Sequence, residues 1–163
     1  MPILVSDSSV LIDLERGGLL ESAFLCGFAM VVPDWLYENE LKDFNGPYLI
    51  QLGLGVTELT PSEMQLAQEV LNVRPELSPE DCFALACATR PDHILLAGDA
   101  SLRAEASARN LAVSGFLWLL DQMRDSNKVA LATLCEGLTK AGGHPRCRLP
   151  KSEVEKRLKA WCI

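Results

Sequence analysis

Three aspartates stand where predicted strands meet helices, which is where side chains can do chemistry together. Asp7 follows the short apolar run at residues 3–5, and Asp99 follows the similar run at residues 93–97. Asp81 lies in the first turn of a predicted helix that leads into the second of these runs. The carboxyl ends of parallel strands meet at one edge of an open α/β sheet, and ligands bind there. We therefore expect the three carboxylates to gather at that edge.

A fourth acid, Glu40, lies within the helical pattern at residues 34–44, directly after the apolar run at residues 29–32. Pointing over the sheet edge, Glu40 would join the three aspartates. Four neighbouring carboxylates raise one another's pKa values unless a cation neutralises them. Mg²⁺ and Mn²⁺ prefer carboxylate and water oxygens, and such a site can activate water and hold a phosphodiester. The pattern thus favours metal-dependent phosphodiester hydrolysis.

Each acid also has a purely structural explanation. Asp7 and Asp99 precede helical patterns, at positions where Asp commonly caps a helix N-terminus. Asp81 is the third residue after Ser78, which is the capping-box position, and Glu40 could lie at the solvent border. Three caps need no metal, so the residues by themselves leave both interpretations open.

The elements that must position these acids alternate along the chain. Helical patterns separate five short apolar segments that are typical of buried strands, at residues 3–5, 29–32, 56–60, 93–97 and 111–113. This alternation predicts an α/β doubly wound fold with a parallel, five-stranded sheet. The pattern does not reveal the strand order.

Length and composition are those of a single globular domain, since the chain has 163 residues. No apolar run is long enough to span a membrane, and the N-terminus lacks the basic region of a signal peptide. We therefore expect a soluble, cytoplasmic protein without membrane contact. Cys26, Cys82 and Cys87 lie in apolar helical patterns, so we expect them to be reduced core residues.

Charge is distributed unevenly. The formal net charge of −7 argues against attraction of nucleic acid by the overall field. Residues 140–163, however, contain seven basic and two acidic residues and carry +5, which leaves −12 on residues 1–139. We divide the chain into a domain at residues 1–140 and a basic C-terminal extension at residues 141–163, with a helix near its end. A basic run of this kind is usually a solvated surface.

Four motifs, in order along the chain, resemble those of the PIN domain ribonucleases. They are VSDSSVLIDL at residues 5–14, VVPDWLYENEL at 31–41, DCFALACA at 81–88 and LAGDASLR at 96–103. The resemblance covers about residues 1–125, and its nearest subgroup is the toxins of bacterial and archaeal toxin–antitoxin pairs. Where many members carry a further acid after the fourth motif's aspartate, this chain has Ser101 and Arg103.

The resemblance implies a three-layer α/β/α fold with strand order 3-2-1-4-5 and Mg²⁺- or Mn²⁺-dependent cleavage of RNA. The catalytic and metal-binding acids would be Asp7, Asp81, Asp99 and Glu40, with Glu40 holding or orienting water. It also implies a small antitoxin partner. The alternative is a weakly active or inactive PIN-like domain that binds nucleic acid or protein.

Substrate contacts follow partly from position. Ser8 and Ser9 stand at a helix N-terminus, where hydroxyl and backbone N–H groups can contact a phosphate. Ser101 and Arg103, after the fourth motif, are further candidates, and so are Arg109 and the basic tail. The apolar stretch at residues 111–120, together with the second helix, could also support a homodimer.

Overall fold

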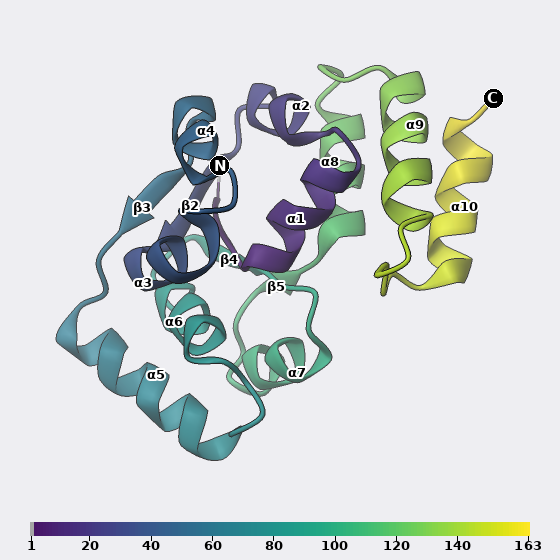
Figure 1. Ribbon diagram of the computed structural model, residues 1–163. Helices are drawn as coiled ribbons and strands as arrows, with labels where there is room; N and C mark the ends of the chain where they lie inside the picture. The colour runs from purple at the N-terminus through teal and green to yellow at the C-terminus, as the bar shows by residue number, and fades with distance from the viewer. Residues whose placement is uncertain (1) are drawn as a thin grey trace.

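A five-stranded parallel sheet forms the centre of the computed structural model, which describes residues 2–163 (Figure 1). The strands are β1 (Ile3–Ser6), β2 (Ala29–Pro33), β3 (Gly55–Thr57), β4 (His93–Leu96) and β5 (Val113–Ser114). Their order in the sheet is β3-β2-β1-β4-β5, and every neighbouring pair is parallel. The predicted fold class and the strand order implied by the family resemblance are both confirmed.

The central position of β1 explains its composition. Leu4 pairs in register with Met30 of β2 on one side and with Ile94 of β4 on the other. Helices cover both faces of such a strand, so apolar side chains can be buried in succession rather than alternately. Leu4 and Val5 are accordingly both fully buried.

Helices flank the sheet in two groups (Figure 1). One group consists of α5, α6 and α7, and the other contains α1, α2 and α8. Outside this second group, α9 packs on α1 and α8, and α10 packs on α9. The bounds are α1 (Ser8–Arg16), α2 (Leu20–Leu25), α3 (Asp34–Leu36), the π-helical turn η1 (Tyr37–Leu41), α4 (Gly46–Leu52), α5 (Pro61–Val73), α6 (Pro79–Cys87), α7 (Ala100–Ala108), α8 (Phe116–Asp125), α9 (Leu131–Gly142) and α10 (Lys151–Trp161).

The single helix expected over residues 34–44 is wrong. After the short α3, the backbone N–H of Lys42 donates to the Tyr37 carbonyl at 2.7 Å, an i→i+5 bond that defines η1. Asn45 then adopts a left-handed conformation with φ 60°, which turns the chain into α4. The last strand also differs, because β5 covers Val113–Ser114 instead of residues 111–113.

The C-terminal helix α10 packs along α9 and is anchored by side chains (Figure 1). Arg157 donates two hydrogen bonds to Asp121 of α8, at 2.9 and 2.7 Å. Trp161 is buried, and the Arg124 guanidinium lies 6.0 Å from its ring centroid. These contacts fix the far end of the basic extension against the rest of the fold.

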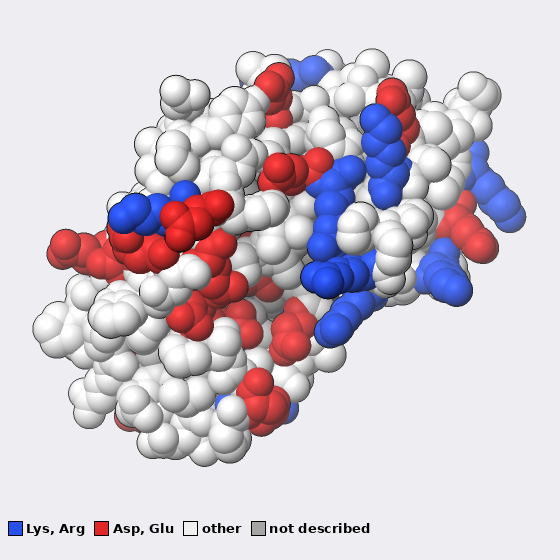
Figure 2. Space-filling view, viewed as in Figure 1, with Lys and Arg blue, Asp and Glu red and all other residues white. Residues whose placement is uncertain are grey.

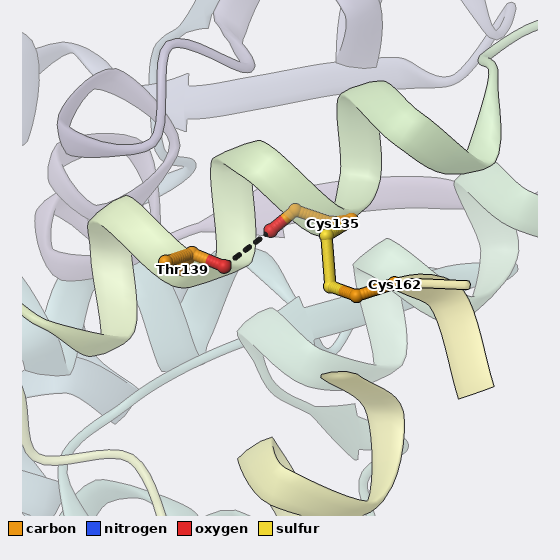
Figure 3. The surroundings of a disulfide bond; sticks show 3 residues. All are labelled: Cys135, Thr139 and Cys162. Carbon is orange, nitrogen blue, oxygen red and sulfur yellow. Dashed lines mark hydrogen bonds between the residues drawn. A yellow bond between two sulfur atoms is a disulfide. The ribbon is translucent and has the colours of Figure 1, made fainter. Parts of the chain in front are cut away.

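A disulfide between Cys135 and Cys162 adds a covalent link from α9 to the residue that follows α10 (Figure 3). In the same region, the Thr139 hydroxyl donates to the Cys135 carbonyl at 2.7 Å. The cysteine pattern did not predict this pairing. The expectation for Cys26, Cys82 and Cys87 is confirmed, because all three are buried free thiols.

Within the described residues, no helix combines the length and the apolar character needed to cross a membrane.

Candidate active site

Asp7 stands between β1 and α1 and is 3% exposed. Its Oδ1 accepts hydrogen bonds from the Val10 backbone N–H at 3.0 Å and the Ser9 hydroxyl at 2.8 Å. Its Oδ2 accepts from the Gly98 backbone N–H at 3.1 Å. Asp7 therefore caps α1, as its position predicts, and also joins the carboxyl ends of β1 and β4.

Only a glycine fits at position 98 if its backbone N–H is to donate to Asp7. A Cβ atom at residue 98 would lie 2.8 Å from the Ser9 hydroxyl oxygen. Since that hydroxyl donates to Asp7, a side chain here would push apart the groups that hold the carboxylate. The glycine thus permits the close approach of the β4–α7 connection to the N-terminus of α1.

Burial raises the pKa of Asp7 from 3.8 to about 6. The hydrogen bonds from Val10, Gly98 and Ser9 lower this pKa in part, whereas the nearby Asp81 carboxylate raises it further. A carboxyl group taken out of water and placed near a second acid resists ionisation, and a positive charge nearby would relieve that cost.

Glu40 lies on η1, and its carboxylate turns towards the N-terminus of α1. The Ser8 hydroxyl donates to Glu40 Oε2 at 2.6 Å, while Oε1 is buried and has no hydrogen-bond partner among the described residues. Burial raises the pKa of Glu40, the Ser8 bond lowers it, and Glu80 and Asp81 raise it. π-Helical turns occur frequently at functional sites. Here the turn carries a carboxylate with one unsatisfied oxygen.

The other two aspartates stand at helix N-termini. Asp99 caps α7, with Oδ2 accepting the Leu102 backbone N–H at 2.9 Å. Asp81 lies in the first turn of α6, where its backbone N–H donates to the Ser78 hydroxyl at 3.1 Å. Burial raises the pKa of Asp81, and the Asp99 carboxylate raises it further. Asp7 and Asp99 thus do cap their helices, as their positions predict. Capping is compatible with both carboxylates lying at the same edge of the sheet.

All four acids line one cleft of about 630 Å³, so the expected convergence takes place. Ser8 and Ser9 line it as well. The rest of the lining comes from α1, from the start of α6 and α7 and from the α9–α10 connection, namely Ile12, Asp13, Arg16, Ser78, Gly98, Ala100, Arg146, Arg148 and Leu149. Figure 2 shows acidic surface gathered on one side of a hollow and basic surface on the other.

The donors in this cleft suit a hard cation in chemistry, because they are carboxylate oxygens. The unpartnered Glu40 Oε1 also points to a missing hydrogen-bond donor or cation. In the side-chain arrangement seen for residues 2–163, however, no group of three or more His, Cys, Asp or Glu residues could hold a metal ion. The capping bonds of Asp7 and Asp99 draw these carboxylates towards their own helices, so the acids share a cleft without forming a closed ligand set.

Two predicted substrate-binding residues lie outside the cleft lining. Ser101 does not line it, and Arg103 instead donates to the Ala97 carbonyl at 3.0 Å. Arg109 pairs with Glu105 at 2.6 Å, which occupies its guanidinium. Arg146 and Arg148 do line the cleft. The basic charge of the extension was their only signal in the sequence, because their place opposite the acids depends on how α10 docks.

Comparison with known families agrees with this geometry. A family model described as a PIN domain (DUF3368) matches residues 3–161. The match therefore includes most of the basic extension as well as the part that carries the four motifs. Neither the curated proteins nor the solved structures include a significant match to the chain.

Proposed function

Because the chain belongs to the PIN domain family, we propose that it is a divalent-metal-dependent endoribonuclease that hydrolyses RNA phosphodiester bonds. PIN domains are generally nucleases, and membership of this family supports a hydrolase activity for the chain. The observation that carries the finer proposal is the lining of one cleft by Asp7, Glu40, Asp81 and Asp99.

Mutual repulsion among these four carboxylates is the physical argument that the site binds a divalent cation. The pKa values of Asp7, Glu40 and Asp81 are all raised by burial, and in each case another carboxylate raises the pKa further. Bound Mg²⁺ or Mn²⁺ would supply the positive charge that neutralises the carboxylates and the developing charge on phosphate. Asp7, Asp81 and Asp99 would hold the ion, with Glu40 completing the set, after their side chains turn from the arrangement seen for residues 2–163.

Other groups of the chain would orient the carboxylates and the substrate. The Val10 and Gly98 N–H groups hold the Asp7 carboxylate in one orientation. Ser8 binds Oε2 of Glu40 and leaves the buried Oε1 without a partner among the described residues. A rotation of the carboxylate towards the cleft would let Oε1 accept a hydrogen bond from the attacking water and orient it. The first N–H groups of α1, at Ser8 and Ser9, can donate to a phosphate oxygen because no helical carbonyl precedes them.

The decisive experiment is cleavage of a mixed small-RNA pool by purified protein with Mg²⁺, Mn²⁺ or EDTA. We expect cleavage with metal, none with EDTA, and loss of cleavage in Asp7→Asn. Calorimetry with Mn²⁺ alone gives a readout that does not depend on activity, and we expect Asp7→Asn to weaken binding. An active EDTA-treated protein, or an Asp7→Asn variant as active as the wild type, would contradict the proposal.

A specific observation favours a second candidate, a weakly active or inactive PIN-like domain that binds nucleic acid or protein. Asp7 and Asp99 both make the capping bonds expected of purely structural residues. For this candidate, the same calorimetry would detect no Mn²⁺ binding and the RNA pool would remain intact.

The biological role that we propose is that of a cytoplasmic toxin in a toxin–antitoxin pair. Its support is the likeness of the four motifs to those of PIN domain toxins. Induced expression should arrest growth, Asp7→Asn should abolish the arrest, and co-expression of a small protein encoded beside it should relieve it. Growth that continues despite verified soluble expression of the wild-type protein would count against this role.

We also propose a homodimer, but the apolar stretch at residues 111–120 would not form its interface. Phe116, Leu119 and Leu120 of that stretch are buried in the core of the single chain. On the second helix, Leu25 is 72% exposed, so α2 is the surface that a dimer would use. Sedimentation analysis of the wild type and Leu25→Asp tests this, with dissociation expected in the variant.

A further inference from the structure

Two arginines of the C-terminal extension line the same cleft as the four acids. Arg146 and Arg148 lie on the connection between α9 and α10, and both line the cleft that contains Asp7 and Glu40. Figure 2 shows Lys and Arg surface on the side formed by this part of the chain, across a hollow from Asp and Glu surface. The extension that appears in the sequence as a basic tail therefore supplies one wall of the site.

Arg146 and Arg148 are exposed residues, and the side chain of neither makes an ion pair or hydrogen bond within residues 2–163. Other arginines of the chain are already engaged in ion pairs with carboxylates. Arg157 is bound by Asp121 at 2.7 Å, and Arg109 by Glu105 at 2.6 Å. Arg16 also lines the cleft, but its guanidinium pairs with Asp13 at 3.8 Å. Arg146 and Arg148 thus retain their planar sets of donors, which match the geometry of phosphate oxygens.

The fold holds the connection that carries these arginines in place. The Cys147 backbone N–H donates to the His144 carbonyl at 2.9 Å, and the Arg146 N–H donates to His144 Nδ1 at 3.1 Å. On its C-terminal side, α10 is docked by the Arg157–Asp121 pair and the Cys135–Cys162 disulfide. A short loop held at both ends loses less conformational entropy on binding a ligand than a free tail does, so it can position two guanidinium groups at a smaller entropic cost.

Electrostatics gives these arginines a specific task. Residues 1–139 carry −12, so the acidic side of the cleft repels RNA. A metal among the acids would attract a single phosphate, whereas the neighbouring phosphates of the strand need a separate source of positive charge. Arg146 and Arg148 provide it at the cleft itself.

We infer that Arg146 and Arg148 bind backbone phosphates of the RNA next to the scissile bond and hold the strand against the four acids. This inference rests on the proposed ribonuclease function. It assigns to the C-terminal extension a substrate-binding role in that site. The class of ligand is a polyanion with a phosphodiester backbone.

The test compares Arg146→Gln/Arg148→Gln with a matched control, Lys156→Gln/Lys159→Gln. The control removes the same charge from α10, at exposed residues that do not line the cleft. A fluorescent single-stranded oligoribonucleotide is titrated in EDTA at several salt concentrations, and cleavage is measured separately with Mn²⁺. Thermal melting verifies that both variants fold.

We expect the arginine variant to bind RNA about tenfold or more weakly and its salt dependence (log Kd against log salt) to fall by about 1.4, as for the loss of two contacts to single-stranded RNA. The lysine control should change affinity only by about twofold. If the wild type binds and cleaves RNA and the two variants behave alike, the inference is wrong while the ribonuclease proposal stands. Tighter binding or faster cleavage by the arginine variant also overturns it. If the wild type neither binds nor cleaves RNA, both proposals fail.

Discussion

Ser8 and Glu40, which are separated by 32 positions in the sequence, are joined by a 2.6 Å hydrogen bond from the Ser8 hydroxyl to Glu40 Oε2. The bond ties the first turn of α1 to the π-helical turn η1. It occupies one oxygen of the glutamate and leaves the buried Oε1 without a partner. The direction of Glu40 is therefore decided by a residue next to Asp7, on a different element.

Replacing Ser8 by alanine tests this coupling. The Ser8 bond lowers the pKa of Glu40, so Ser8→Ala should raise that pKa and leave the carboxylate less well oriented. We expect RNA cleavage to fall by about tenfold and the acidic limb of its pH profile to move to higher pH. Ser101→Ala is the matched control, because Ser101 does not line the cleft. An unchanged pH profile in Ser8→Ala would show that the bond does not tune Glu40.

Burial of Asp7 predicts an unusual dependence of stability on pH in metal-free protein. Its pKa is about 6 in the folded protein and 3.8 in the unfolded chain, so the folded state binds more protons between these values. Stability should therefore fall as the pH rises from about 4 to about 7, by up to about 3 kcal/mol from this residue. The measurement is denaturant unfolding in EDTA across this range for the wild type and Asp7→Asn.

Asn at position 7 can still cap α1 through its amide oxygen. The amide NH₂ group would replace Oδ2, and it cannot accept the hydrogen bond that the Gly98 N–H donates there. Asparagine does not ionise in this range, so the informative quantity is the change with pH in the difference between the two proteins. We expect the wild type to lose stability relative to Asp7→Asn on going to neutral pH. A constant difference would mean that Asp7 ionises normally.

Arg90 predicts a purely structural effect away from the cleft. Its Nε and Nη2 donate to the two oxygens of Glu63 at 2.8 and 2.9 Å, and Nη1 donates to Thr57 at 3.0 Å. Lysine cannot reproduce this fork, so Arg90→Lys should lower the free energy of unfolding by about 1–2 kcal/mol. Lys42→Ala removes an exposed pair with Glu38, which solvent screens, and should leave the free energy of unfolding nearly unchanged. Equal effects would refute the special role of the fork.

The same pair gives a second pH dependence, of opposite sign to that of Asp7. The Arg90 hydrogen bonds lower the pKa of Glu63 from 4.5 to about 2. The folded state holds fewer protons here than the unfolded chain, so the stability from this group is present above pH 4.5 and is lost as the pH falls towards 2. Acid unfolding of Arg90→Lys should therefore show a weaker loss of stability in this range than the wild type.

The Cys135–Cys162 disulfide should anchor α10 under oxidising conditions. The two cysteines are separated by 27 positions, and closing such a loop contributes about 2–4 kcal/mol in the chain-entropy model. Adding a reductant should lower the melting temperature of the wild type, whereas it should not affect the double variant Cys135→Ser/Cys162→Ser. Cys147→Ser is the control, because Cys147 is a free thiol. Equal melting with and without reductant would show that the bond does not hold the extension.

In a reducing cytoplasm the same two cysteines would be thiols. The remaining anchors of α10, Arg157–Asp121 and Trp161, do not depend on redox state. Quantifying free thiols in protein purified under anaerobic conditions would establish which form exists in the cell.

The sequence alone determined the fold class and most strand and helix positions, because burial on two faces imposes continuous apolar runs and helix N-termini impose caps. These are local constraints, and they suffice to place Asp7, Asp81 and Asp99 at strand and helix ends. The predicted parallel sheet already implied that these acids converge at one edge, and the ordered motifs added the strand order through family resemblance.

Only the tertiary structure decided which side chains share the cleft. The interruption of the expected helix at residues 34–44 by η1 sets where Glu40 points, and it follows from an i→i+5 bond that hydrophobic periodicity does not encode. The Arg103 guanidinium donates to the Ala97 carbonyl, whereas Arg146 lines the cleft because α10 docks on α8 and α9. These outcomes depend on contacts between residues far apart in the chain, and short sequence patterns carry no information about such distances.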